Sequence, residues 1–180
     1  RFFAEHGAKE VIVTDMKSEQ DLAPSVAELR RYPNIRFVLG GHRLDDFSAA
    51  DIVIKNPGVK REGNPYLAAA RCIETDISLF LRFSPAPILG VTGSKGKSST
   101  VSALHYGLRQ CGIPAFLGGN ITVSPLTFLA ETCADTPVVL ELSSWQLGDL
   151  AQCPQFKPKI ALLTAIMPDH QNWYGAMEPY

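Results

Sequence analysis

Short apolar runs alternate with stretches of helical character along most of the chain. The runs are rich in valine, isoleucine and leucine, which is typical of strands that are apolar on both faces. Such strands, when they are separated by helices, indicate parallel sheets that are covered on both sides. The pattern therefore predicts an α/β fold with strands over residues 10–15, 35–40, 51–56, 87–92, 114–119, 137–142 and 159–164.

Helices are predicted between these strands, over residues 18–32, 64–72 and 75–83. Residues 97–111 also place apolar side chains at helical spacing, from Val101 to Cys111, so that they would face a sheet. Gly112 then ends that helix.

Two prolines in residues 84–87 interrupt the pattern just before a new strand begins. We place a domain boundary there, which gives a first domain of residues 1–86 and a second of residues 87–180. The first residues are typical of the tail of a helix that runs into a strand, and the last residues follow a strand as a loop. We therefore expect a fragment of a longer protein.

The composition is that of a globular protein, since 46% of the 180 residues are hydrophobic and 19% are charged. A formal net charge of -1 gives no basic surplus for a nucleic-acid backbone, so we expect no nucleic-acid partner. No apolar run reaches the roughly 18 residues of a membrane span, and no signal peptide opens the chain, so we expect no membrane association. The four cysteines are widely spaced, with no C-x-x-C pair and no histidine at zinc spacing. We interpret them as reduced, packed thiols of a cytoplasmic protein.

The segment GVTGSKGKSST, residues 90–100, is similar to a phosphate-binding loop, although Val91 stands where the usual motif has glycine. It follows a predicted strand and opens a predicted helix, as such a loop must. Glycines let the backbone wrap around phosphate oxygens, and a helix N-terminus presents unpaired N–H groups. We expect Lys97 to reach the outer phosphates of a nucleotide and Ser98 to place its hydroxyl on Mg²⁺; an ordinary strand-to-helix turn is the alternative. For Lys95, a solvated side chain competes with a phosphate contact.

Polar side chains follow other predicted strands, at the edge where parallel sheets bind ligands. Glu141 is a candidate Mg²⁺ ligand or, alternatively, a cap for the next helix. Asp169 and His170 run off the last strand, and His170 has a functional or a structural role. Asn120 is a cleft residue or part of a plain turn. Asp15 ends the first strand, where a carboxylate holds a ribose hydroxyl in Rossmann-like units, or it is simply a loop residue.

The motifs GVTGSKGKSST, GGNI, ELSSWQL and PDH, in this order and at these separations, resemble the Mur ligases, the ATP-dependent amide-forming enzymes of peptidoglycan synthesis. The stretches VTD, ADIVIKNPGV and APILGVTG also fall in the order of the family, so the resemblance covers nearly the whole chain. GGNI and ELSSWQL favour the activity that adds D-glutamate to UDP-N-acetylmuramoyl-L-alanine. These two motifs favour that activity over the activities of the ligases for later peptide residues and of folylpolyglutamate synthase.

The resemblance implies a Rossmann-like N-terminal domain that holds the UDP substrate, a central P-loop ATPase domain, and a C-terminal domain that closes over the nucleotide. Residues 1–86 would form most of the first domain and residues 87–180 about half of the second, both with largely parallel sheets, and the C-terminal domain would be absent. We expect the complete enzyme to be a cytoplasmic monomer that uses ATP and two Mg²⁺ sites. We expect this chain by itself to be inactive.

The resemblance also implies roles for single residues. The ATP-binding residues would be Gly93, Ser94, Lys95, Gly96, Lys97, Ser98, Ser99 and Asn120. The metal ligands would be Ser98, Glu141 and His170, with His170 at the second metal. The substrate-binding residues would be Asp15, Lys17, Asn56, Pro57, Gly58, Asn120 and His170. Lys97 and His170 would act in catalysis. Lys17 stands where the family more usually has arginine, and a lysine lacks the planar guanidinium that contacts two acceptors at once.

Other functions remain open at the level of the sequence. Another Mur-type ligase or a folylpolyglutamate-type ligase would use the same loop with different substrates. A P-loop ATPase that acts as a switch or in transport would hydrolyse ATP regardless of amino acid or sugar nucleotide. The chain could also be a nucleotide-binding module without ligase activity.

Overall fold

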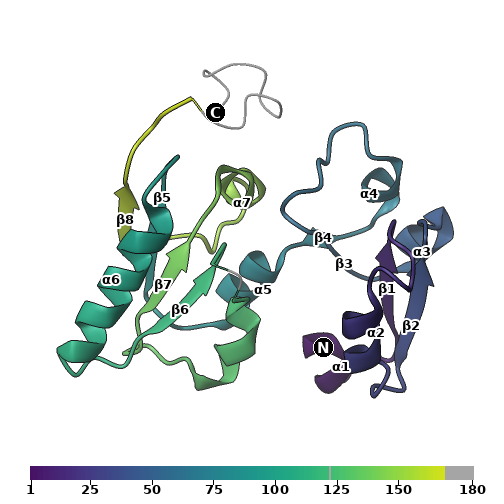
Figure 1. The fold of residues 1–180 in the computed structure, drawn as a ribbon, viewed down its shortest axis with the longest axis horizontal. Coiled ribbons are helices and arrows are strands. Elements are labelled where there is room, and N and C mark those ends of the chain that lie inside the picture. Colours follow the sequence, from purple (N-terminus) through teal and green to yellow (C-terminus); the bar gives the residue numbers. More distant parts are fainter. Residues whose placement is uncertain (122, 169–180) are drawn as a thin grey trace. The chain divides into compact units, whose positions relative to one another are not determined.

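The computed structural model describes residues 1–121 and 123–168 of the chain (Figure 1). These residues form two compact units, the first from Arg1–Lys55 and Val59–Glu74, and the second from Asn56–Gly58 and Thr75 onward. The chain therefore changes unit between Glu74 and Thr75, about ten residues before the proline-containing segment at 84–87 that suggested a boundary.

The first unit holds two short parallel sheets and four helices among its described residues (Figure 1). The helices are α1 (Phe2–Glu5), α2 (Ala23–Leu29), α3 (Leu44–Ala49) and α4 (Pro65–Ala69). The strands are β1 (Val11–Asp15), β2 (Ile35–Leu39), β3 (Val53–Ile54) and β4 (Ile73–Glu74). β1 pairs with β2, with Asp15 opposite Leu39, and β3 pairs with β4, with Ile54 opposite Glu74.

The second unit is built on a four-stranded parallel sheet with the strand order β6-β7-β5-β8. Its strands are β5 (Ile88–Thr92), β6 (Phe116–Gly119), β7 (Val138–Glu141) and β8 (Ile160–Leu163). Its helices are α5 (Asp76–Phe83), α6 (Lys97–Gln110), α7 (Ser144–Leu150) and the 3-10 helix η1 (Pro125–Glu131). Because the strands are parallel, the loops after β5, β6 and β7 all leave the same edge of the sheet.

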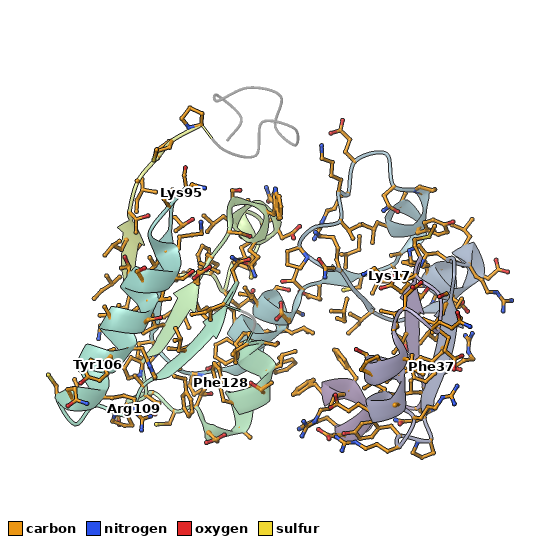
Figure 2. All side chains as sticks on the ribbon, viewed as in Figure 1. Lys17, Phe37, Lys95, Tyr106, Arg109 and Phe128 are labelled. Carbon is orange, nitrogen blue, oxygen red and sulfur yellow. The ribbon has the colours of Figure 1, made fainter. Side chains whose placement is uncertain are left out.

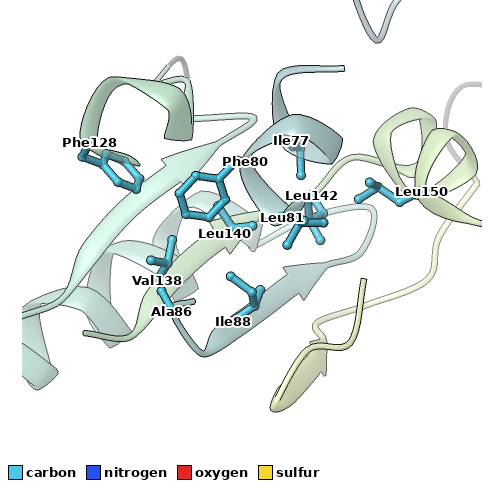
Figure 3. Packing of buried hydrophobic residues seen from close by; sticks show 10 residues of the cluster. All are labelled: Ile77, Phe80, Leu81, Ala86, Ile88, Phe128, Val138, Leu140, Leu142 and Leu150. Atoms are coloured by element: carbon cyan, nitrogen blue, oxygen red, sulfur yellow. The ribbon is translucent and has the colours of Figure 1, made fainter. Parts of the chain in front are cut away.

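Side chains on both faces of β5 and β7 are buried, as their apolar runs predict. The edge strand β8 is exposed along its length, so the expected cover on both sides is wrong for that strand. On one face, Ile88 and Leu140 lie in a cluster with Phe80 of α5 and Phe128 of η1 (Figure 3). On the other face, the strands bury Leu89, Val91 and Val139 against Val101 of α6. Val101 is fully buried, which confirms the predicted inner side of that helix. The α/β fold with parallel sheets is therefore confirmed.

Helix α5 explains why the division lies before the proline-containing segment. Thr75 and Ser78 form a reciprocal capping box at the start of the helix, which fixes the helix start at that point. The helix then buries Ile77 and Phe80 in the core of the second unit. The 84–87 segment is thus a turn between α5 and β5, both of which belong to the second unit.

Several details differ from the sequence-based expectation. The apolar run at 51–56 forms a strand of only two residues, Val53–Ile54. The helix expected at 18–32 spans only the seven residues Ala23–Leu29. Residues 44–49, 73–74 and 125–131 form elements that the apolar pattern did not predict. Cys111 and Cys133 are exposed, so the expectation of packed thiols is wrong for these two. Among the described residues, no helix is both long and apolar enough to cross a membrane.

Candidate functional site

The loop between β5 and α6 depends on two glycines. Gly93 has a φ of +133° and Gly96 a φ of +84°, backbone conformations that side chains other than glycine rarely adopt. Space is also short at Gly93, where a Cβ atom would lie 2.3 Å from Thr164 Oγ1 and 2.8 Å from the Ala165 carbonyl oxygen. The loop therefore follows a path that requires glycine at Gly93, while Val91 is a buried strand residue.

The N-terminus of α6 has no side-chain cap, because the residue at the N-cap position is Gly96. The first N–H groups of a helix have no helical acceptor, and they carry the positive end of the helix dipole. Ser98 and Ser99 are exposed in this first turn. Lys95 is also exposed, and Figure 2 shows its side chain at the end of the second unit where the loop lies. These features are what an anion-binding helix terminus needs.

Lys97 folds back onto the loop. Its Nζ atom donates to the Gly93 carbonyl at 2.6 Å and lies 3.3 Å from the Ser94 carbonyl. The ammonium group is therefore held beside the loop backbone, at the start of the uncapped helix. A phosphate bound there would compete with these two carbonyls for the ammonium protons.

Ser94 faces the segment that follows β8. Its N–H donates to the Ala165 carbonyl at 2.7 Å, and its hydroxyl donates to the Met167 carbonyl at 2.9 Å and accepts from the Met167 N–H at 2.9 Å. The residue is only 3% exposed. The predicted contact of Ser94 with phosphate stays a prediction, and its amide and hydroxyl are engaged by neighbouring protein in this structure.

Glu141 lies at the end of β7, directly beside the strand that leads into the loop. It pairs in register with Val91 of β5 and with Gly119 of β6. The side chain is 2% exposed; Oε1 accepts from Asn120 Nδ2 at 2.8 Å, and Oε2 has no hydrogen-bond partner among the described residues. A buried carboxylate oxygen without a partner is costly, and a bound cation would satisfy it.

The helix after Glu141 has a different cap. Ser143 and Gln146 form a capping box at the start of α7, in which each side chain bonds the backbone N–H of the other residue. The alternative that Glu141 caps this helix is therefore wrong. Asn120 is tied to Glu141 twice, because its backbone N–H also donates to the Glu141 carbonyl at 2.8 Å. Gly119 permits this approach, since a Cβ atom there would lie 2.2 Å from that carbonyl oxygen.

A family model supports the resemblance seen in the sequence. The model of the Mur ligase middle domain matches residues 91–180, which is half of the chain and includes the loop, Asn120 and Glu141. The chain belongs to the Mur ligase family.

Two curated relatives of this Mur ligase chain share one name. The UDP-N-acetylmuramoylalanine–D-glutamate ligase of Treponema pallidum is 58% identical over an alignment of 193 residues, which covers 99% of this chain and 36% of the relative. The enzyme of the same name from Borreliella afzelii is 49% identical and is covered to 39%. The chain thus spans less than two fifths of the length of these relatives.

A solved structure shares the fold of this Mur ligase chain. It is the crystal structure of UDP-N-acetylmuramate:L-alanyl-gamma-D-glutamyl-meso-diaminopimelate ligase from Neisseria meningitides, with a TM-score of 0.58. The match covers 98% of this chain and 58% of that one at 19% identity. At this identity the likeness supports the fold alone.

In the first unit of the Mur ligase chain, the ends of β1 and β2 form adjoining turns. Asp15 Oδ1 accepts from the Lys17 N–H at 2.8 Å, and the Asp15 and Lys17 carbonyls accept from the N–H groups of Gly41 and Gly40. Lys17 is exposed (Figure 2). One carboxylate oxygen of Asp15 therefore shapes the turn, and its predicted role toward the substrate stays a prediction.

Asn56–Gly58 group with the second unit, whereas Asp15 and Lys17 belong to the first. Asn56 Oδ1 accepts from the Gly58 N–H at 2.9 Å, so the asparagine closes a tight turn around Pro57. The structure describes each unit by itself. That Asp15, Lys17 and this turn bind the same substrate thus remains a prediction.

The predicted second metal site is not described. Asp169 and His170 lie outside the described residues, which end at Pro168. Among the residues that are described, no three histidine, cysteine, aspartate or glutamate side chains converge as a metal site. The roles of His170 in metal binding, substrate binding and catalysis stay predictions.

Sequence reasoning missed Thr164, which directly follows β8 and contacts the loop through its hydroxyl. Its hydroxyl lies 2.6 Å from the Lys95 carbonyl oxygen and 3.1 Å from that of Thr92. The available signal was a polar residue directly after an apolar strand. That signal gains meaning only once β8 is known to lie beside β5.

Proposed function

We propose that the protein containing this chain is an ATP-dependent ligase that adds D-glutamate to UDP-N-acetylmuramoyl-L-alanine in peptidoglycan synthesis. The observation that carries the proposal is the buried Glu141 carboxylate, whose Oε2 has no partner among the described residues, on the strand next to the glycine-rich loop. The names of the curated relatives support the choice of the two substrates. The proposal concerns the full-length protein, because the chain spans 36% of the first of these relatives.

The proposed reaction has two steps. The carboxylate of the UDP-linked substrate takes the terminal phosphoryl group of ATP, which leaves ADP and an acyl phosphate. The amine of D-glutamate then attacks the acyl carbon, phosphate departs with the electrons of the broken C–O bond, and the amine loses a proton as the amide forms. The main obstacle is charge, since an anionic carboxylate must approach a polyanionic triphosphate.

The loop residues would meet this obstacle by positioning and neutralising the phosphates. The N–H groups at the start of α6 would bind phosphate oxygens, and Lys97 would exchange its contact with the Gly93 carbonyl for the outer phosphates. The exposed positions of Ser98 and Ser99 in the first turn are compatible with such contacts. The exposed Lys95 would add positive charge at the mouth of the site.

The residues around Glu141 fit a divalent cation. Mg²⁺ prefers oxygen ligands, and Glu141 Oε2 and the Ser98 hydroxyl would supply them. Asn120 would orient the carboxylate, because it holds Oε1 at 2.8 Å. When bound, the ion supplies charge neutralisation between the phosphates and the substrate carboxylate. A second ion would involve His170.

The UDP end of the substrate would lie against the turns of the first unit. Asp15 and Lys17 follow β1, at the carboxyl edge where open α/β sheets bind ligands. We also propose that Asn56, Pro57 and Gly58 bind the substrate. We further propose that the protein is a cytoplasmic monomer and that this chain alone lacks ligase activity.

The test is phosphate release by the full-length protein with ATP and UDP-N-acetylmuramoyl-L-alanine. D-glutamate is compared with L-alanine, L-lysine and meso-diaminopimelate, and each mixture is repeated without the UDP-linked substrate. We expect phosphate only when D-glutamate and the UDP-linked substrate are both present.

Each alternative gives a different pattern in this assay. Release that needs another amino acid would assign another Mur-type or folylpolyglutamate-type reaction. Release that is indifferent to both substrates would indicate a P-loop ATPase of a different kind. ATP binding without any release would leave a nucleotide-binding module and would refute the ligase proposal.

A further inference from the structure

Two side chains share the carbonyl groups of the loop. The Thr164 hydroxyl oxygen lies 2.6 Å from the Lys95 carbonyl oxygen and 3.1 Å from that of Thr92, and its single proton can be donated to one of them at a time. The Lys97 ammonium serves the two between them, those of Gly93 and Ser94, at 2.6 and 3.3 Å. The Thr92 carbonyl also accepts from the Thr164 N–H at 3.0 Å, which leaves the hydroxyl proton for the closer Lys95 carbonyl.

Holding these carbonyls also orients the N–H groups of the loop. In a planar trans peptide the C=O and the N–H of the next residue point in opposite directions. The bond from Thr164 to the Lys95 carbonyl therefore turns the N–H of Gly96 away from Thr164. A loop that binds an anion needs its N–H groups turned toward the ligand and its carbonyls turned away.

The two donors differ in how firmly they are held. Thr164 is anchored by the sheet, because its N–H donates to the Thr92 carbonyl at 3.0 Å and the preceding residue, Leu163, pairs with Thr92. Lys97 has a long flexible side chain, and its ammonium is the group that would turn to the phosphates. When Lys97 leaves the loop carbonyls, the Thr164 contacts would remain.

We propose that Thr164 is a positioning residue for the nucleotide phosphates, which holds the loop in its binding shape while Lys97 moves from the loop carbonyls to the ligand. The inference rests on the proposed nucleotide site. The same segment contacts the loop again through Met167 and Ser94, and it leads in sequence into Asp169 and His170. The loop and the last described residues thus form one hydrogen-bonded unit.

The test compares the dissociation constant of Mg²⁺–ATP for variants of the full-length protein by titration calorimetry. Thr164→Val keeps the shape of the side chain but removes the hydroxyl, and we expect a roughly tenfold weaker affinity because the Lys95 carbonyl loses its side-chain donor. Thr164→Ser restores the hydroxyl, and we expect an affinity within about twofold of the wild type.

A matched control separates positioning from general destabilisation. Thr136→Val makes the same chemical change at a buried threonine of the second unit, which lies before β7 and bonds Cys133. We expect Thr136→Val to lower the thermal midpoint without changing the affinity for Mg²⁺–ATP. The Michaelis constant for UDP-N-acetylmuramoyl-L-alanine should stay unchanged in both valine variants. If Thr164→Val does not fold, Thr164→Ala replaces it.

The outcomes distinguish this inference from the proposed function. Wild-type protein that binds ATP, together with a Thr164→Val affinity within about twofold of it, would overturn the positioning role and leave the ligase proposal intact. Equal losses in Thr164→Val and Thr136→Val would overturn it as well. A wild-type protein without affinity for ATP would overturn both proposals.

Discussion

Replacing Gly93 by alanine tests whether the shape of the loop is needed for nucleotide binding. At a φ of +133°, an alanine would carry backbone strain of about 1–3 kcal/mol. Its Cβ atom would lie 2.3 Å from Thr164 Oγ1 and 2.8 Å from the Ala165 carbonyl oxygen, and overpacking of this kind costs about 1–3 kcal/mol more. If half of a total near 4 kcal/mol falls on the binding conformation, the affinity for Mg²⁺–ATP drops about thirtyfold.

The assay is calorimetric titration of the full-length Gly93→Ala variant with Mg²⁺–ATP, accompanied by thermal unfolding. Gly107→Ala is the matched control, because Gly107 lies in α6, has no positive φ, and has nothing within 4 Å of an added Cβ atom. Alanine is a better helix former by about 0.5–1 kcal/mol, so the control should raise the thermal midpoint and leave the affinity unchanged. Wild-type affinity in Gly93→Ala would refute the argument that the glycine path is needed.

Three further substitutions or measurements probe other contacts. Gly119→Ala should lower the free energy of unfolding by at least about 2 kcal/mol, because φ is +94° and the new Cβ atom would meet the Glu141 carbonyl at 2.2 Å; denaturant unfolding checks it. Ser143→Ala should cost about 1 kcal/mol in the same assay, as the α7 cap is lost, with ATP affinity unchanged. The Thr136 hydroxyl lowers the pKa of the Cys133 thiol. Alkylation of Cys133 should therefore begin at lower pH in the wild type than in Thr136→Val, as followed by mass spectrometry.

Much of the sheet could be predicted from the sequence because burial on both faces leaves a local signal. Residues 87–92 and 137–142 are continuous apolar runs, and the structure places strands within both. The run at 51–56 has a similar composition but pairs over Val53–Ile54 only. The length of a strand depends on which strand pairs with it, and the sequence of one segment does not show which strand that is.

Some parts of the candidate site could likewise be predicted from the sequence, and others could not. The glycine-rich loop and its helix are local, so their spacing was visible in residues 90–100. The sequence left Glu141 as either a metal ligand or a helix cap. Only the hydrogen bonds between Ser143 and Gln146 in the structure exclude the helix cap. Thr164 could not be found, because its role depends on the neighbouring positions of β5 and β8, which are distant in sequence.

The compact units divide at a different place from the proline-containing segment. Prolines at 85 and 87 interrupt secondary structure, and that interruption was interpreted as a linker. Compactness depends instead on where α5 buries its apolar side, and Ile77 and Phe80 lie in the core of the second unit. Which unit a helix joins is a tertiary property.

The central claim is that the loop and Glu141 serve the same cation. The most direct measurement is a double-mutant cycle on the full-length protein with Ser98→Ala, Glu141→Gln and the double variant, in which the Mg²⁺-dependent gain in ATP affinity is determined for each. If both residues bind one ion, the double variant should lose little more than the worse single variant, because ligands that act as a unit are not additive. Losses that add in full, or a Glu141→Gln variant with the wild-type Mg²⁺ dependence, would contradict the account.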